Sequence, residues 1–461
     1  MNNLLLRRTD TRYRPLMHFS AEKGWINDPN GLIYFKGKYH LFYQHNPHSA
    51  VWSSMHWGHA ISTDMLHWED LPIALYPDAD YDKDSEGGCF SGSAIEKDGR
   101  LYLMYTGTVH RNGNCYQTQN IAYSDDGITF TKYKNNPVIY KPEGAGEDFR
   151  DPKIFFYDGL YYAVIGGTID NDGKVFLYTS SDILHWEYKG ILFDSEGKVA
   201  TMIECPDFFF LDGHWVLIFS PIGNPDRRKC IYYAGDMDFN TCRFTPRWNG
   251  VMDYGPDFYA PQTFLDKNGN RVIIAWMNRW QWMPYAEERE YSEKEGWRGA
   301  LTLPRILHLD EGYRLWFSHL PEFVHIFSKT DCSRNINISN EVPLVLPREN
   351  AERLKISFIE DKIDSAAFTI RLSDVSSIVL DLLSRKCMYI IEKNGGYGIM
   401  SAPLCNGNNH TLDIILDKAE IEIFIDDGFS CITAEDFSNQ KPIEFCTPYK
   451  TVELDYISVS H

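Results

Sequence analysis

A chain of 461 residues is too long for one compact core, and the usual scaling of domain size predicts about two or three domains. A composition of 43% hydrophobic and 24% charged residues is typical of a folded, water-soluble protein and excludes an extensively disordered chain. The net charge of −19 argues against nucleic acid or a membrane as the main partner, because both attract basic surfaces. A small phosphorylated substrate is still compatible with this charge, since one or two arginines would bind it.

The first fifteen residues carry three leucines at positions 4–6, followed by Arg7 and Arg8. Three leucines are too few for the core of a signal peptide, and the charges follow the apolar stretch instead of preceding it. The sequence contains no run of 18 apolar residues, so no transmembrane helix is predicted. Ten cysteines without a signal peptide predict reduced thiols and a cytoplasmic location.

Five hairpin turns recur along the first two thirds of the chain. Each is a polar residue followed by glycine, and each precedes a strand rich in aromatic and branched residues. The glycines are 54 to 62 residues apart. The turns are Lys36-Gly37, Asp98-Gly99, Asp158-Gly159, Asp212-Gly213 and Asn268-Gly269.

A second marker, a serine two residues before an aspartate, repeats in step with these turns at Ser62, Ser124 and Ser180. A period of this length holds about four strands, which is the size of one propeller blade. We therefore predict an all-β fold in which residues 1–320 form a five-bladed β-propeller. A large β-sandwich with unrelated Asp-Gly hairpins is the alternative.

The texture of the sequence changes after Pro321. Short alternating strands, such as 366–370 and 420–425, are separated by turns at 394–396 and 426–428. This pattern predicts a β-sandwich domain over residues 321–461. We expect it to brace the propeller or to mediate self-association into a homo-oligomer.

Three carboxylates are predicted to meet in the propeller channel. Asp28, Asp151 and Glu204 each lie eight or nine residues before the turn glycine of their blade, and Ser91 holds the same position in the second blade. The first strand of every blade lines the channel, so equivalent positions converge there. The blade register therefore predicts one site at one end of the axis.

The local sequences predict different roles for two of these carboxylates. Asp28 lies in a turn rich in hydrogen-bond donors, which would keep it ionised. Glu204 lies between apolar residues, where partial desolvation would raise its pKa. Glycoside hydrolysis needs such a pair, one carboxylate as nucleophile and one carboxyl as acid.

Simpler interpretations of the same residues remain open from the sequence alone. Asp28 could cap its own turn, Asp151 could be a turn residue paired with Arg150, and Asp207 is a second candidate for the acid. His56 and His59 have no third ligand at a suitable spacing, so we expect packing and no metal site. The sequence also contains no phosphate-binding loop, dinucleotide fingerprint or paired Cys-x-x-Cys, so no cofactor is expected.

At these residues the sequence resembles glycoside hydrolase family 32, the invertases, sucrose-6-phosphate hydrolases and fructan hydrolases. The resemblance covers nearly the whole chain and implies a five-bladed propeller followed by a β-sandwich. The motifs that carry it are WINDPNG at 25–31, WGHA at 57–60, FSGS at 90–93, RDP at 150–152, EC at 204–205, DFYA at 257–260 and GALTLPR at 299–305.

The resemblance also implies roles for individual residues. Asp28 would be the nucleophile, Glu204 the acid/base, and Asp151 would hold the fructosyl hydroxyls and steady the transition state. Cys205 would tune the acid. The positions implied to line the fructose pocket are Asn27, Gln44, Trp52, Phe90, Ser91, Arg150 and Trp276.

The expected activity is that of a retaining β-fructofuranosidase acting on sucrose or sucrose 6-phosphate, most like the intracellular bacterial enzymes. An exo-acting hydrolase of inulin, levan or kestose, a fructosyltransferase and a non-catalytic sugar-binding propeller are the alternatives. The sequence does not decide whether the leaving group carries a phosphate. Candidate phosphate partners are Arg111, Arg227, Arg228 and Arg279.

Overall fold

The computed structural model of the chain describes residues 11–224, 229–277, 290–363, 367–393, 396–447 and 451–461. Strands dominate it, and the described helices are short: α1 (Glu290–Lys294) and two 3-10 turns at Pro321–His325 and Glu360–Lys362. The predicted all-β class is confirmed. Among the described residues, no helix has the length and apolarity to cross a membrane. The ten cysteines are all free thiols.

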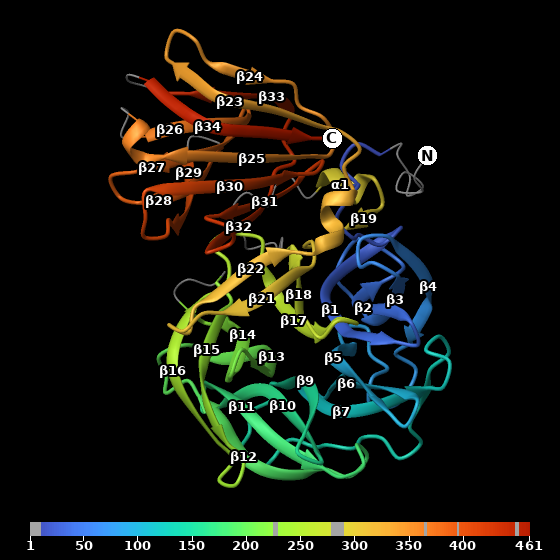
Figure 1. Cartoon of the computed structure of the whole chain (residues 1–461). Helices are drawn as coiled ribbons and strands as arrows, with labels where there is room; N and C mark the ends of the chain where they lie inside the picture. The colour runs from blue at the N-terminus through green and yellow to red at the C-terminus, as the bar shows by residue number, and fades with distance from the viewer. Residues whose placement is uncertain (1–10, 225–228, 278–289, 364–366, 394–395, 448–450) are drawn as a thin grey trace.

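Five mainly antiparallel sheets follow one another along the first two thirds of the chain and surround a common centre (Figure 1). The first contains β1 (Gly24–Phe35), β2 (Lys38–Asn46), β3 (His56–Ser62), β4 (Trp68–Leu75) and β19 (Trp297–Arg298). The second contains β5 (Gly88–Lys97), β6 (Arg100–Arg111), β7 (Asn114–Ser124) and β8 (Thr131–Lys132). The third contains β9 (Phe149–Tyr157), β10 (Leu160–Ile169), β11 (Asp172–Ser180) and β12 (Glu187–Asp194).

The fourth sheet contains β13 (Met202–Leu211), β14 (His214–Ile222), β15 (Ile231–Asp238) and β16 (Arg243–Val251). The fifth contains β17 (Tyr259–Leu265), β18 (Arg271–Met277), β20 (Ala300–Leu301), β21 (Arg305–Leu309) and β22 (Leu315–His319). The first strands contact one another in sequence, β1 with β5, β5 with β9, β9 with β13 and β13 with β17. Contacts of β17 with β1 close the ring.

The predicted hairpin turns connect the first two strands of these sheets. In the first sheet Lys36 and Gly37 have φ of 48° and 82°, and the same pair of positive angles recurs at the next three turns. A two-residue turn of this kind matches the twist of the flanking strands. The serine–aspartate marker is also a turn: the Ser62 hydroxyl accepts the Met65 N–H, and Asp64 accepts the N–H groups of Leu66 and His67.

The last third of the chain forms two six-stranded sheets with a shared apolar core (Figure 1). One sheet contains β23 (Thr330–Ser339), β34 (Thr451–Ser460), β25 (Glu352–Ile359), β30 (Asn409–Leu416), β31 (Glu420–Ile425) and β32 (Ser430–Glu435). The other contains β24 (Leu344–Leu346), β33 (Gln440–Cys446), β26 (Ala367–Ser373), β27 (Ser376–Asp381), β28 (Lys386–Lys393) and β29 (Gly396–Pro403). Residues such as Ile370, Ile414 and Phe445 are fully buried in this core.

A buried ionic network joins the ring to β31. Arg305 donates to Asp253 at 2.9 Å and to Glu422 at 2.8 Å, and all three side chains are inaccessible to solvent. His18 lies between Asp417 and Glu422, at 3.1 and 3.0 Å. Burial alone would lower the pKa of His18, but the two carboxylates outweigh it and raise that pKa to about 10. Each cation of the network therefore has two carboxylate partners, as buried ions require.

Candidate active site

The first strand of every sheet in the ring breaks its pairing register at the same level. These breaks fall between Ile26 and Pro29, Phe90 and Gly92, Glu204 and Asp207, Tyr259 and Gln262, and in β9 between Arg150 and Lys153. A bulge leaves residues out of the ladder and re-aims their side chains. The bulges therefore turn the predicted site residues toward the centre of the ring.

Proline contributes to these bulges, because it cannot donate to a strand ladder. Pro29, Pro152 and Pro206 directly follow Asp28, Asp151 and Cys205. Asp151 and Cys205 also have positive φ, 64° and 48°. Such angles are strained for residues other than glycine and cluster at functional sites.

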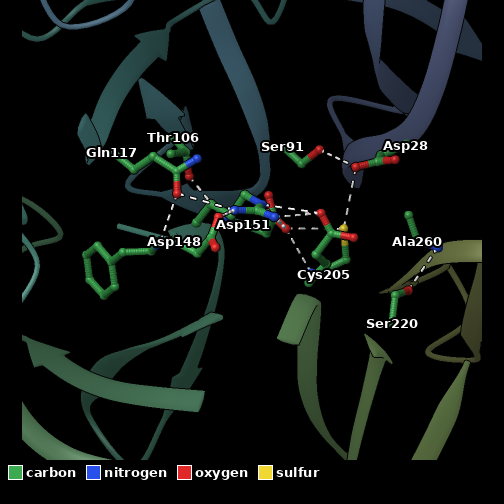
Figure 2. A network of polar contacts seen from close by, with 12 residues as sticks. Asp28, Ser91, Thr106, Gln117, Asp148, Asp151, Cys205, Ser220 and Ala260 are labelled. Atoms are coloured by element: carbon green, nitrogen blue, oxygen red, sulfur yellow. Dashed lines mark hydrogen bonds and ion pairs between the residues drawn. The ribbon is translucent and has the colours of Figure 1, made fainter. Parts of the chain in front are cut away.

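Asp28 is held by three neighbours, of which Figure 2 shows Ser91 and Cys205. Ser91 donates to its Oδ2 at 2.6 Å, Asn27 donates to its Oδ1 at 2.9 Å, and the Cys205 Sγ lies 3.5 Å from Oδ2. Burial raises the pKa of Asp28, against the hydrogen bonds from Ser91 and Asn27, and the nearby charge of Glu204 raises it further. Asn27 supplies a donor of the expected turn, but desolvation outweighs the donors in setting the direction of the pKa shift.

Glu204 is the more accessible carboxyl, with 22% of its side chain exposed. The Tyr259 hydroxyl donates to its Oε2 at 2.6 Å, and Arg150 donates to its Oε1 at 2.9 Å. Arg150 also donates to Asp148. The apolar setting expected from the flanking sequence is therefore replaced by two donors from other strands. No role was predicted for Tyr259, although the DFYA motif contains it.

Asp151 is almost fully buried and lies beside both other carboxyls. Its Oδ2 accepts the Cys205 N–H at 2.9 Å and lies 3.5 Å from the Cys205 Sγ. Burial raises the pKa of Asp151 to about 7; Arg150 lowers it, while Glu204 and Asp28 add to the rise. The Cys205 thiol thus lies between the carboxylates of Asp28 and Asp151 (Figure 2).

The raised pKa of Asp151 has a consequence for stability. The folded chain holds a proton on Asp151 that the unfolded chain loses near its ordinary pKa of 3.8, so the group's contribution falls as pH rises from about 4 to 7. We expect Asp151→Asn, which stays neutral, to raise the free energy of unfolding relative to the wild type by on the order of 2 kcal/mol at about pH 8. The gain should be much smaller at about pH 4.

Urea unfolding of both proteins across this pH range measures the difference. A substitution Asp158→Asn in an exposed hairpin turn is the matched control, because asparagine tolerates the positive φ of 45° there. A stability difference for Asp151→Asn that is the same at every pH would contradict the prediction.

The three carboxylates line a cavity of about 410 Å³ together with most of the predicted pocket residues. The predicted residues found in its lining are Asn27, Gln44, Trp52, Phe90, Ser91 and Arg150. The residues that sequence reasoning did not place there are Glu86, Thr108, His110, Cys115, Gln117, Asp148 and Tyr259. Most of these residues lie on β6 and β7 or in the segments before β5 and β9. The repeat in the sequence does not predict which side chains of these segments face the cavity.

Trp276 does not belong to the described lining of this cavity, contrary to expectation. It lies on β18, the second strand of its sheet, and its indole packs on the Trp25 ring at 5.8 Å between centroids. Only 1% of Trp276 is exposed. The Trp25 indole in turn donates to Asn27 at 2.7 Å. Trp276 therefore supports the cavity wall from behind.

Other candidates from the sequence also fall outside the cavity. Asp207 is fully buried and accepts from Lys153 at 2.8 Å and from the Thr263 N–H at 2.7 Å. His59 stacks on Phe42 with ring centroids 4.1 Å apart. The described metal-compatible clusters, His18–Asp417–Glu420 and Cys405–His410–Asp426, include no cavity residue.

The candidate phosphate partners are not found in the described lining either. Arg111 donates to the Asp80 carbonyl at 2.7 Å. Arg227, Arg228 and Arg279 lie outside the described residues.

The chain matches the Glycosyl hydrolases family 32 N-terminal domain over residues 18–318. It belongs to glycosyl hydrolase family 32. It is 37% identical to the raffinose invertase of Escherichia coli, over 94% of this chain and 91% of the relative. It is 36% identical to the sucrose-6-phosphate hydrolase of Escherichia coli, over 92% of this chain and 88% of the relative.

Among solved structures, the family 32 chain is similar to a mutant of the Bombyx mori GH32 beta-fructofuranosidase BmSUC1 in complex with sucrose. The TM-score is 0.82 at 31% identity, covering 97% of this chain and 93% of that one. The family resemblance stated from the motifs is confirmed, and with it a glycoside hydrolase built as a β-propeller followed by a β-sandwich.

Proposed function

We propose that this family 32 chain is a retaining β-fructofuranosidase that releases fructose from sucrose or sucrose 6-phosphate. The observation that carries the proposal is the meeting of Asp28, Glu204 and Asp151 in one cavity, with Cys205 between two of them. The similarity to an invertase, a sucrose-6-phosphate hydrolase and a sucrose-bound β-fructofuranosidase supports the substrate class.

The reaction proceeds in two displacements. Asp28 attacks the anomeric carbon of the fructosyl group while Glu204 protonates the departing oxygen, so the glycosidic bond breaks as the ester bond to Asp28 forms. Glu204, now a carboxylate, takes a proton from water, and the hydroxyl displaces Asp28 from the sugar. Tyr259 and Arg150 orient Glu204 through one oxygen each.

Retention requires the two carboxyl groups to be about 5–5.5 Å apart. Product analysis in aqueous methanol tests directly whether the anomeric configuration is retained. Retention gives methyl β-fructofuranoside as the first product, and the α-anomer would point to inversion.

We assign the fructosyl ring to the part of the cavity beside Asp28. Trp52 and Phe90 supply apolar ring faces, with centroids 6.1 Å apart, of the kind that pack on sugar C–H groups. Gln44 is anchored by donation to the Cys89 carbonyl at 2.9 Å. With Asn27 and Ser91, these residues form the wall that we assign to fructose.

The architecture supports a matching assignment. We infer that the five sheets of the ring are the blades of a five-bladed propeller within residues 1–320 and that residues 321–461 form the sandwich domain. One first strand per sheet and the closure of β17 on β1 support this division. Ten free thiols suit a reducing, cytoplasmic compartment. Self-association of the chain is tested by light scattering after size-exclusion chromatography.

Turnover of sucrose, sucrose 6-phosphate, 1-kestose and inulin, measured side by side, tests the proposal. We expect fructose release with kcat/KM at least about tenfold higher for sucrose or its phosphate than for kestose or inulin. Preference for inulin would reassign the chain as a fructan hydrolase. Fructosyl oligomers as main products at high sucrose would indicate a transferase, and no release from any substrate would indicate a sugar-binding protein.

A further inference from the structure

The cavity has a buried floor and an acidic mouth. Asn27, Gln44, Ser91 and Asp151 at the floor are each nearly inaccessible to solvent. At the mouth, Glu86 and His110 are exposed, and Cys115 and Asp148 are partly exposed. Because Asp28 bonds to Ser91 and Asn27 of the floor, a fructosyl group in reach of Asp28 directs its leaving group to the mouth.

The mouth residues belong to one side of the ring, between the segment before β5 and the segment before β9. Behind Glu86 and His110 lies Asp84, which accepts both of their backbone N–H groups, at 2.7 and 2.6 Å. Burial opposes ionisation of Asp84, but these donors outweigh it and lower its pKa. Two lining carboxylates, Glu86 and Asp148, thus stand in front of a third negative charge.

Among the residues that the structure describes, positively charged side chains are scarce at the mouth. Of the cavity-lining residues that the structure describes, only Arg150 is a lysine or arginine. Its guanidinium already donates to Asp148 and to Glu204, so its charge is shared by two carboxylates. Among these lining residues His110 is the other side chain that can carry a positive charge, and its Nδ1 already lies 3.5 Å from the Asp84 carboxylate. A phosphate at the mouth would therefore meet Glu86, Asp84 and Asp148 with both lining cations already beside carboxylates.

We propose that the mouth of the cavity selects an uncharged leaving group, so that sucrose is the substrate and sucrose 6-phosphate is discriminated against. Glu86 is the specificity-determining residue, and Asp148, which is paired with Arg150, lies on the same side of the mouth. This inference rests on the proposed function. Its physical basis is repulsion between like charges, which is strong near a partly dehydrated surface and weakens with added salt.

Raffinose separates charge from size. It carries an uncharged galactosyl group on the glucosyl 6-oxygen, the oxygen that is phosphorylated in sucrose 6-phosphate. If charge decides, the chain accepts raffinose and discriminates against the smaller phosphate. If closure of the mouth decides, both substrates are poor relative to sucrose.

The experiment measures kcat/KM of the full chain for sucrose, raffinose and sucrose 6-phosphate at about 20 mM and about 300 mM salt, where the Debye length differs about fourfold. We expect sucrose 6-phosphate to be at least about tenfold worse than sucrose at low salt. The ratio of kcat/KM for sucrose over sucrose 6-phosphate should fall at high salt. The kcat/KM for raffinose should stay within about threefold of that for sucrose at both salt concentrations.

Glu86→Lys reverses one mouth charge on an exposed side chain, and Glu86→Gln removes it without changing its size. We expect the ratio of kcat/KM for sucrose over sucrose 6-phosphate to fall about tenfold in Glu86→Lys and about threefold in Glu86→Gln. The matched control is Glu69→Lys on β4, an exposed outer-strand residue that should leave the ratio unchanged.

Three results would overturn the inference: equal or better turnover of sucrose 6-phosphate by the wild type, a ratio insensitive to both Glu86 substitutions and salt, or raffinose as poor as the phosphate. All three leave the β-fructofuranosidase assignment intact, because fructose is still released. Release of fructose from none of the three substrates is the separate result that removes the proposed function, and this inference with it.

Discussion

Replacement of Asp28 by asparagine is expected to lower kcat for sucrose by on the order of 10⁴-fold or more, with an unchanged fold. The substitution removes the nucleophilic oxygen yet retains the shape that Ser91 and Asn27 contact. Burial raises the pKa of Asp28, so replacing it by a neutral amide also removes a desolvated charge. Initial rates of fructose release measure the loss of kcat. A urea unfolding curve measures how removal of the desolvated charge changes the free energy of unfolding.

Asp158→Asn is the matched control for Asp28→Asn, since the same chemical change is made in an exposed turn. It should retain wild-type rates. A drop in kcat of less than about tenfold for Asp28→Asn would show that another group attacks the sugar.

Glu204→Gln is expected to lower kcat for sucrose by about 10³-fold or more, because a glutamine can neither protonate the leaving oxygen nor deprotonate water. A fructoside with a leaving group that needs no proton, such as p-nitrophenol, bypasses the first role. With that substrate the first displacement should recover while the second stays slow. Mass spectrometry should then detect a fructosyl adduct on the peptide that contains Asp28.

Azide provides the complementary measurement, since it attacks the intermediate without general-base help. It should accelerate Glu204→Gln and form fructosyl azide, while leaving the exposed-site control Glu187→Gln on β12 at wild-type rates. Equal losses for sucrose and the activated fructoside, with no rescue, would assign the proton transfers to a different residue.

Local sequence predicted those features that depend on spacing along one strand. The turn at Gly37 marks the end of β1. Counting back nine residues from this turn therefore predicts the level of Asp28 along the axis of the ring. The same count applies to Asp151 and Glu204, and the structure brings the three together in one cavity. The prolines after Asp28 and Asp151 were a further usable signal, because they mark the bulges that turn those side chains inward.

Counting residues along one strand could not predict the features that depend on contacts between sheets. Burial raises the pKa of Asp28 despite the donors around it, and that burial comes from the whole ring. Tyr259 reaches Glu204 from the neighbouring sheet. The mouth residues Glu86 and Asp148 lie in connections between strands, where no repeat sets their direction.

The carboxylate of Glu422 lies late in the chain but contacts residues from both ends of the ring. It accepts from His18, which precedes β1, and from Arg305 of β21, so one late residue fastens both ends of the ring. Until β31 leaves the ribosome, a nascent chain that has completed all five sheets has Asp253 but not Glu422 to pair with Arg305. We therefore expect truncation before β31 to remove the contact that holds both ends of the ring, far from the carboxylates of the cavity.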